Sequence, residues 1–269
     1  MVAPSPSSKP PSPNPAVILS RVPTELAALH GDRFAALSAE LSKAGVSFAV
    51  VDSVYDMPDD SPEVDFLSSV QGGMIFLGWH YPRALKWILA RHGVVPVRCL
   101  DARLEPVALV AQVMESLAGA SGALVPAPPL AAALQSRWYP VLDDNQCTNC
   151  MDCLDFCLFG VYGVDAQEKL RVVSPEQCRQ DCPACARVCP AGAIIFPKYQ
   201  GDPGIAGAEP GLEGAPRKLD LSGLFGKPKG VHQAQLERAS EVQKSEGGKR
   251  PAGADKVEQL SREFDELKL

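Results

Sequence analysis

Cysteine is the residue type in this sequence most able to do chemistry. The chain has 269 residues and nine cysteines, and eight of the nine fall within residues 147–189. A cysteine framework of disulfides is typical of small secreted proteins, whereas this chain is long and shows no export signal, so metal binding is the better interpretation. The candidate metal ligands are Cys147, Cys150, Cys153, Cys157, Cys178, Cys182, Cys185 and Cys189.

The spacing of these cysteines favours an iron–sulfur centre over zinc. The first set reads Cys-x2-Cys-x2-Cys-x3-Cys from Cys147, and the second reads Cys-x3-Cys-x2-Cys-x3-Cys-Pro from Cys178. Zinc ribbons usually pair two separated Cys-x2-Cys knuckles, whereas each set here runs its ligands together and ends after three residues. Three cysteines on a tight loop can surround one cubane, while the fourth is carried into a helix and reaches another cluster. Zinc and structural thiols remain the alternatives.

Residues 139–199 resemble the bacterial-type ferredoxins, which hold two [4Fe-4S] clusters and carry the run C-x2-C-x2-C-x3-C-P twice. The resemblance includes VLDDNQC before the first loop, VVSPEQC before the second and CPAGAIIF after it. It implies a dicluster fold with crossed ligation. Cluster 1 would then take Cys147, Cys150, Cys153 and Cys189, and cluster 2 would take Cys178, Cys182, Cys185 and Cys157.

Two positions depart from this family's pattern. Leu158 stands where the family has proline after the fourth cysteine, and one extra residue lies between Cys178 and Cys182. Proline restrains the chain without being a ligand, so its loss is expected to loosen the turn after Cys157 and leave the site intact. The longer second loop is expected to change the hydrogen bonds to its cluster, and hence the reduction potential.

The surroundings of the clusters are expected to be apolar and their potentials low. Every ligand is a thiolate, and no histidine between Cys147 and Cys189 suggests a Rieske-type centre. Neighbouring side chains expected to exclude water are those of Phe156, Phe159, Val161, Ile194 and Phe196.

The N-terminal half of the chain alternates apolar runs with helical patterns. Strands are expected over 16–19, 46–52, 73–78 and 94–100, separated by helices with apolar residues at helical spacing. This alternation predicts an α/β domain with a small open, mostly parallel sheet, of flavodoxin-like type. A thioredoxin-like sheet with a late hairpin is the alternative. Helix starts are expected at Ser61-Pro62 and near Pro106.

The predicted organisation has five parts. A disordered leader (1–15) precedes the α/β domain (16–119), a Pro- and Ala-rich linker (120–138), the dicluster domain (139–199) and a disordered tail (200–269). The tail ends in an amphipathic helix, which either docks on a partner or is simply solvated. Its apolar face would carry Val257, Leu260, Phe264 and Leu267.

One strand end in the α/β domain could hold an organic cofactor. Ligands of open parallel sheets bind beyond the carboxyl ends of the strands, where Gly78-Trp79-His80-Tyr81 lies. Trp79 and Tyr81 could stack on a flavin while His80 hydrogen-bonds to it. Against this, SRVPTE after the first strand lacks a Gly-rich phosphate cradle. Cys99 is expected to be a buried thiol, with a redox-active thiol as the alternative.

These observations predict an iron–sulfur electron-transfer protein or subunit that exchanges electrons with a partner oxidoreductase, rather than an enzyme. The alternative is an oxidoreductase whose N-terminal domain binds flavin or another organic cofactor fed by the clusters. A net charge of −6 argues against nucleic acid, and the absence of a long apolar stretch argues against a membrane span, so a cytoplasmic protein is expected. Acidic residues that could dock a basic partner are Asp143, Asp144, Asp152, Asp155 and Asp181.

Overall fold

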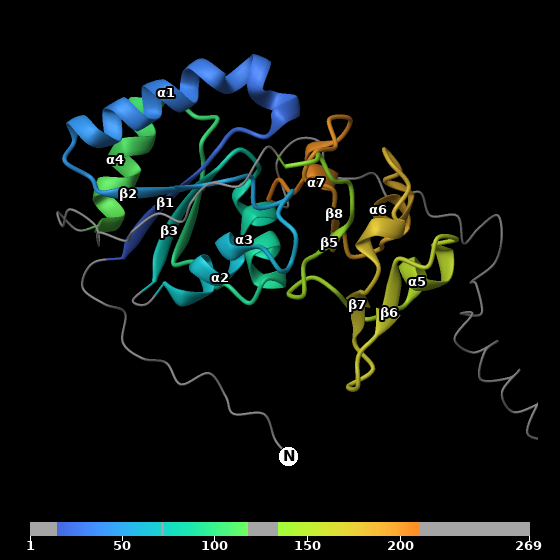
Figure 1. Cartoon of the computed structure of the whole chain (residues 1–269). Coiled ribbons are helices and arrows are strands. Elements are labelled where there is room, and N and C mark those ends of the chain that lie inside the picture. Colours follow the sequence, from blue (N-terminus) through green and yellow to red (C-terminus); the bar gives the residue numbers. More distant parts are fainter. Residues whose placement is uncertain (1–14, 71–72, 118–133, 210–269) are drawn as a thin grey trace, which may run out of the picture. The chain divides into compact units, whose positions relative to one another are not determined.

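The N-terminal half folds around a four-stranded parallel sheet with the strand order β2-β1-β3-β4 (Figure 1). The computed structural model describes residues 15–70, 73–117 and 134–209, which all belong to one compact unit within Met1–Leu219. The two central strands are buried along their whole length, which explains their uninterrupted apolar sequences. The strands are β1 (Ala16–Ser20), β2 (Phe48–Val51), β3 (Met74–Gly78) and β4 (Arg98–Asp101).

Helices cover both faces of this sheet. Helices α1 (Ala27–Lys43) and α4 (Pro106–Leu117) lie on one face, and α2 (Pro62–Ser69) and α3 (Pro82–Arg91) lie on the other (Figure 1). The short 3-10 helix η1 (Thr24–Leu26) leads into α1. Ser61 caps α2 by accepting the Val64 N–H at 3.3 Å, with proline at the first helical position. The predicted α/β fold with a parallel sheet is confirmed, and the described strands of this sheet include no antiparallel hairpin.

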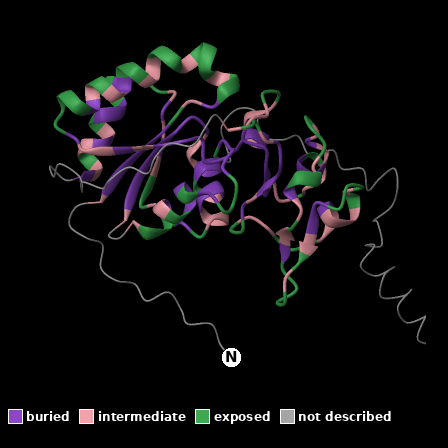
Figure 2. Cartoon of the chain, in the orientation of Figure 1, coloured by how far each residue is buried: buried purple, intermediate pink, exposed green. Residues whose placement is uncertain are grey.

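Two hydrophobic cores result, one on each side of the sheet (Figure 2). The core under α1 and α4 contains residues of the N-terminal half only. The core under α2 and α3 also takes in Tyr139, Val141 and Ile195 from the cysteine-rich segment. The two halves of the described chain therefore share a core.

The cysteine-rich segment consists of two short antiparallel strand pairs, two one-turn helices and a short 3-10 helix. Strand β5 pairs with β8, and β6 pairs with β7. Each one-turn helix carries the third cysteine of a set and ends at the fourth. The elements are β5 (Val141–Leu142), α5 (Asp152–Phe156), β6 (Tyr162–Val164), β7 (Leu170–Val172), η2 (Pro175–Gln177), α6 (Ala184–Val188) and β8 (Ile194–Ile195).

Several predicted boundaries differ from the structure. Strand β4 begins at Arg98 rather than at residue 94, because Pro96 lacks the N–H that a strand ladder needs. Val95 and Val97 are accordingly exposed. The prediction of disorder from residue 200 does not hold for residues 200–209, where α7 (Pro203–Ala206) is capped by Asp202 and buries Ile205. The helix was not predicted because the Gly- and Pro-rich composition of this region is typical of disordered segments.

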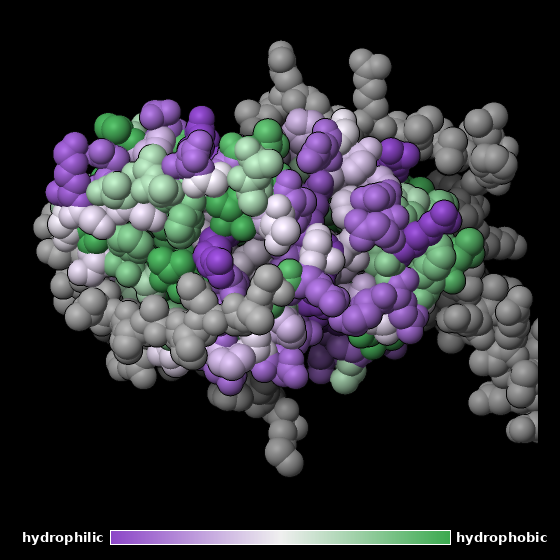
Figure 3. Space-filling model, turned by 45° about the horizontal axis from the view of Figure 1, so that its top comes forward, coloured by the Kyte–Doolittle hydropathy of each residue, from purple (hydrophilic) through white to green (hydrophobic). Residues whose placement is uncertain are grey.

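Other predictions fall outside the described residues. These are most of the leader, most of the linker, and the terminal amphipathic helix with Val257, Leu260, Phe264 and Leu267. Where the chain is described, no helix is long and apolar enough to cross a membrane. The face drawn in Figure 3 has hydrophilic residues concentrated in its middle and hydrophobic residues on either side.

Candidate metal centre

The first cysteine loop is held in a tight, repeatedly reversing conformation. The Asp143 carboxylate accepts the N–H groups of Asn145 at 3.0 Å and Gln146 at 3.3 Å, and its carbonyl accepts Cys147 N–H at 2.9 Å. Asn149 and Met151 then adopt the left-handed conformation, at φ 58° and 66°. Left-handed residues next to ordinary ones turn successive N–H groups toward one concave side, which suits an anionic centre.

Cysteines of both sets meet around one small cavity. Its lining includes Cys147, Cys150 and Cys153 from the first set and Cys189 from the far end of the second. Leu142, Leu170 and Ile194 are among the other residues that line it. Helix α6 delivers Cys189, whose Sγ accepts the Ala193 N–H at 3.3 Å. The four cysteines are those that the ferredoxin resemblance assigns to cluster 1.

The remaining four cysteines form a second group. Burial raises the pKa of Cys178 to about 12, and the neighbouring thiols of Cys185, Cys182 and Cys157 act in the same direction. Burial also raises the pKa of Cys185 to about 12. Helix α5 ends at Cys157, so it carries this residue away from the first loop and toward the second set.

The thiol chemistry of both groups suits a metal centre that supplies positive charge. Burial raises the pKa of Cys153, and the nearby thiols of Cys189 and Cys185 raise it further. Such thiols ionise when a metal ion replaces their protons. Within the described ranges, no three His, Cys, Asp or Glu side chains converge as they would on a single ion.

One known protein is similar to part of this chain. Over 62 residues, the chain is 47% identical to an uncharacterized ferredoxin of Methanocaldococcus jannaschii. The match covers 22% of this chain and 41% of that relative, so the chain spans less than half of the relative's length. No protein-family model matches the chain, and no solved structure matches it significantly.

This chain contains a ferredoxin-like segment.

The first cysteine loop of this segment is tied to the N-terminal half by Arg83 of α3, a buried side chain that sequence reasoning missed. Arg83 Nε donates to Asp143 Oδ2 at 2.7 Å, and its Nη2 donates to the carbonyl of Gly192 at 2.8 Å and to Gln146 Oε1 at 3.1 Å. Both members of the ion pair are about 95% buried. Arg83 therefore joins the segments that precede Cys147 and follow Cys189.

The apolar shell around the cysteines is only partly as expected. Val161, Ile194 and Phe196 are buried in the core of the ferredoxin-like segment. Phe156 and Phe159, predicted to exclude water, are 50% and 41% exposed, and Leu158 between them is 92% exposed. These three side chains flank Cys157 and form an exposed apolar turn, here called the Cys157 turn.

Two further side chains contact the cysteine loops, and neither could be assigned from sequence. The Tyr162 hydroxyl donates to Cys185 Sγ at 3.1 Å from a buried position. The Asn149 side chain accepts the Leu170 N–H and donates to the Glu168 carbonyl, both at 2.8 Å, which fixes the first loop against the β6–β7 turn. In the sequence, nothing marks Tyr162 and Asn149 as contacts of the cysteine loops except their position between or near the cysteines.

The predicted acidic docking residues are not all available at the surface. Asp143 is buried against Arg83, and Asp144 pairs with Arg171 at 3.1 Å. Asp152 follows the first loop directly, at the start of α5. Asp181 lies in the second loop, in the left-handed conformation at φ 59°. The ferredoxin-like segment therefore does not present Asp143 to a partner.

Trp79 and Tyr81, the aromatic residues predicted to stack on a flavin, line one pocket and also contact other side chains of the chain, so flavin binding stays a prediction. Trp79 is 1% exposed, stacks on His30 and donates its Nε1–H to the Ser20 carbonyl at 2.8 Å. The Arg103 guanidinium lies 4.2 Å from the centre of the Tyr81 ring.

Burial raises the pKa of Cys99 to about 12, so this thiol behaves as a small apolar residue.

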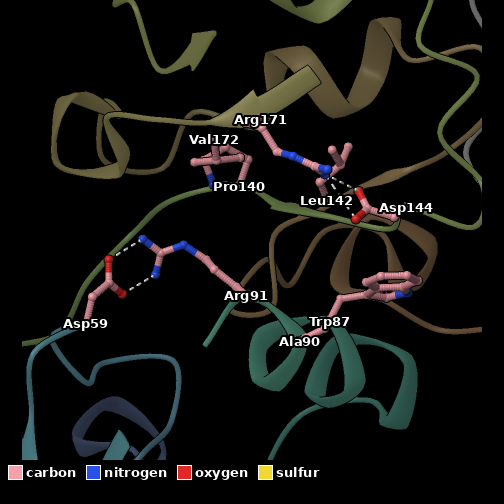
Figure 4. Close-up of a pocket in the computed structure, with 9 residues that line it drawn as sticks. All are labelled: Asp59, Trp87, Ala90, Arg91, Pro140, Leu142, Asp144, Arg171 and Val172. Atoms are coloured by element: carbon pink, nitrogen blue, oxygen red, sulfur yellow. Dashed lines mark hydrogen bonds and ion pairs between the residues drawn. The ribbon is translucent and has the colours of Figure 1, made fainter. Parts of the chain in front are cut away.

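A groove of about 460 Å³ separates α3 from the ferredoxin-like segment (Figure 4). Arg91 donates two hydrogen bonds of 2.7 Å to Asp59, and Arg171 binds both carboxylate oxygens of Asp144. The groove is thus polar, with its charges paired. Leu142 lines both this groove and the cysteine cavity, so the groove reaches within one side chain of the first site.

Proposed function

We propose that this chain is an iron–sulfur electron-transfer protein that relays electrons through two [4Fe-4S] clusters to or from a partner oxidoreductase. The observation that carries the proposal is the convergence of Cys189 with Cys147, Cys150 and Cys153 around one cavity. A chain that used each cysteine set as a separate zinc site would have no reason to bring Cys189 to the first loop.

The proposed ligands leave no iron open for substrate. Each cluster has four cysteines for four irons, so the chemistry supplied is one-electron transfer rather than substrate activation. Backbone N–H groups and the Tyr162 hydroxyl hydrogen-bond to sulfur, which stabilises added negative charge. The similarity to a protein named a ferredoxin supports the same function.

The exposed apolar side chains of the Cys157 turn support contact with a redox partner. Leu158, which replaces the family's proline, is almost fully exposed beside a proposed ligand of cluster 2. Clustered apolar side chains at a surface are typical of interaction sites. We therefore assign the partner-facing side to cluster 2.

Redox titration of the anaerobically purified chain, followed by electron paramagnetic resonance, tests this function. We expect about eight irons and eight sulfides per chain, and two reducible signals of the four-iron type. Stoichiometric zinc without sulfide, or clusters that no reductant reduces reversibly, would exclude an electron carrier.

A further inference from the structure

A second pocket lies at the carboxyl ends of the sheet strands. The strand order β2-β1-β3-β4 reverses between β1 and β3, so the loops that leave these two strands diverge and open a crevice. A pocket of about 300 Å³ occupies this place. Its walls come from residues 25–30 after β1, from residues 79–81 after β3, from Arg103 after β4, and from residues between Pro197 and Ala206, which follow β8.

His80 lines this pocket and has one ring nitrogen with a backbone partner, the carbonyl of Pro197, and one without. It is 3% exposed, and its Nε2 has no hydrogen-bond partner among the described residues. Burial lowers the pKa of His80 to about 3, helped by the charges of Lys198 and Arg103 and opposed by the Pro197 backbone. The imidazole is therefore neutral, and one nitrogen of a neutral imidazole is a hydrogen-bond acceptor.

A second imidazole lines the same pocket. His30 stacks on Trp79, with ring centroids 5.5 Å apart, and its buried Nδ1 also lacks a partner in the described part of the chain. Burial lowers the pKa of His30, and the charges of Arg33 and Arg103 add to this effect. Buried polar atoms without partners are costly. The described residues have six of them, and two of the six belong to residues that line this one pocket, which points to a polar ligand.

The charged side chains of the pocket are already paired. Lys198 binds Glu25 and Asp56, each at 2.6 Å. Arg103 binds Asp101 through two nitrogens, at 2.8 and 2.6 Å. Because each cation has its own carboxylate, the pocket offers no surplus positive charge to an anion. Its volume is at the low end of small-molecule sites, of roughly 300 to 1,000 Å³.

We propose that this pocket binds a small, uncharged polar ring that donates an N–H or O–H hydrogen bond to His80. Leu26, Leu29 and Pro203 provide apolar walls for the ring. Residues that follow β8 complete the pocket, so the ligand would contact both the N-terminal half and the segment after the second cysteine set. The proposal does not depend on the cysteines or on electron transfer.

Saturation-transfer NMR on the full chain with its clusters assembled tests this site. The probes are two pairs of rings that differ only in the donor, namely uracil with 1,3-dimethyluracil and phenol with anisole. We expect at least one donor-bearing ring to bind with millimolar affinity, about tenfold more tightly than its methylated analogue, as one hydrogen bond allows. The variant His80→Phe should reduce this preference to within about twofold.

His92→Phe is the matched control. His92 is also buried with an unpartnered Nε2, but it does not line this pocket, so the tenfold preference should persist. If His80→Phe fails to fold, Leu29→Trp replaces it, because Leu29 is 72% exposed at the pocket wall and the larger ring should block binding. Equal affinity for both members of both pairs, no binding of either donor-bearing ring, or unchanged binding in His80→Phe and Leu29→Trp would overturn the proposal.

Discussion

The two cysteine sets have nearly the same spacing but lie in different surroundings. The first is fixed to the N-terminal half by the buried pair of Arg83 and Asp143, next to a polar groove. The second receives Cys157 from the exposed Cys157 turn, whose apolar side chains face solvent. Ligand spacing alone therefore does not set the role of a proposed cluster. Both sets contact the N-terminal half, the first through Arg83 and the second through Cys178, which packs against the core under α2 and α3. What differs is the exposed apolar turn beside the second set, and we propose that a partner meets the chain there.

The largest expected effect comes from replacing a ligand. Cys157→Ala should remove about half of the iron, and the lost paramagnetic signal should be the one lost in Cys182→Ala, because crossed ligation places both residues on cluster 2. Iron analysis and electron paramagnetic resonance measure this. Cys99→Ser, at a cysteine outside both sets, should keep all of the iron. A signal shared instead with Cys150→Ala would show that each set binds its own cluster, and would contradict the separate roles proposed for the two clusters.

The anchoring of cluster 1 is tested by Arg83→Met. The substitution leaves Asp143 buried without its cation, which should lower the free energy of unfolding by about 3 kcal/mol and speed the loss of cluster 1 to a chelator. Denaturation followed by cluster absorbance gives both quantities. Arg171→Met, at the more exposed pair with Asp144, should cost less than about 1 kcal/mol. Equal effects of the two variants would refute the anchoring role.

The partner-facing role of cluster 2 is tested at Leu158. Leu158→Asp places a charge on the exposed apolar turn, and it should slow electron exchange with a heterologous ferredoxin reductase by about tenfold, the equivalent of 1.4 kcal/mol. Stopped-flow spectroscopy measures the rate. Val173→Asp, at another exposed apolar residue of the segment, should leave it within about twofold. Identical slowing in both variants would mean that any added charge matters, whatever its position.

The smallest expected effect is on the potential of a single cluster. Tyr162→Phe removes the hydrogen bond to Cys185 Sγ, which favours the more negative, reduced state. The potential of cluster 2 should fall by tens of millivolts, since about 59 mV corresponds to 1.4 kcal/mol for one electron. The potential of cluster 1 should stay constant in the same titration. A shift of both potentials would show that the two clusters share their surroundings.

Much of the sheet could be predicted because its information is local. The buried apolar runs of β1 and β3 and the capping pair Ser61-Pro62 act over a few residues, and the structure contains them at or near the expected positions. The predicted start of β4 was wrong because the apolar run includes Pro96. Proline lacks the N–H that a strand ladder needs, and this outweighs the hydrophobicity of its neighbours.

The missed features depend on contacts between distant parts of the chain. Arg83 looks like an ordinary polar residue of an amphipathic helix, and its partner Asp143 lies 60 residues away. Trp79 lies at a strand end, where a ligand would bind. It is nevertheless buried, because it donates a hydrogen bond to the Ser20 carbonyl and stacks on the His30 ring. The assignment of the cysteines to individual clusters remains a prediction.

The contacts of Arg83 also link iron supply to the packing between α3 and the ferredoxin-like segment. Arg83 holds the segments next to Cys147 and Cys189, which are proposed to bind the same cluster. A ligand that binds the assembled state stabilises it by mass action, and an interaction of this kind works in both directions. Cluster insertion should therefore tighten the contact between α3 and the ferredoxin-like segment. Iron starvation should loosen this contact, so the packing of α3 would depend on whether the clusters have been assembled.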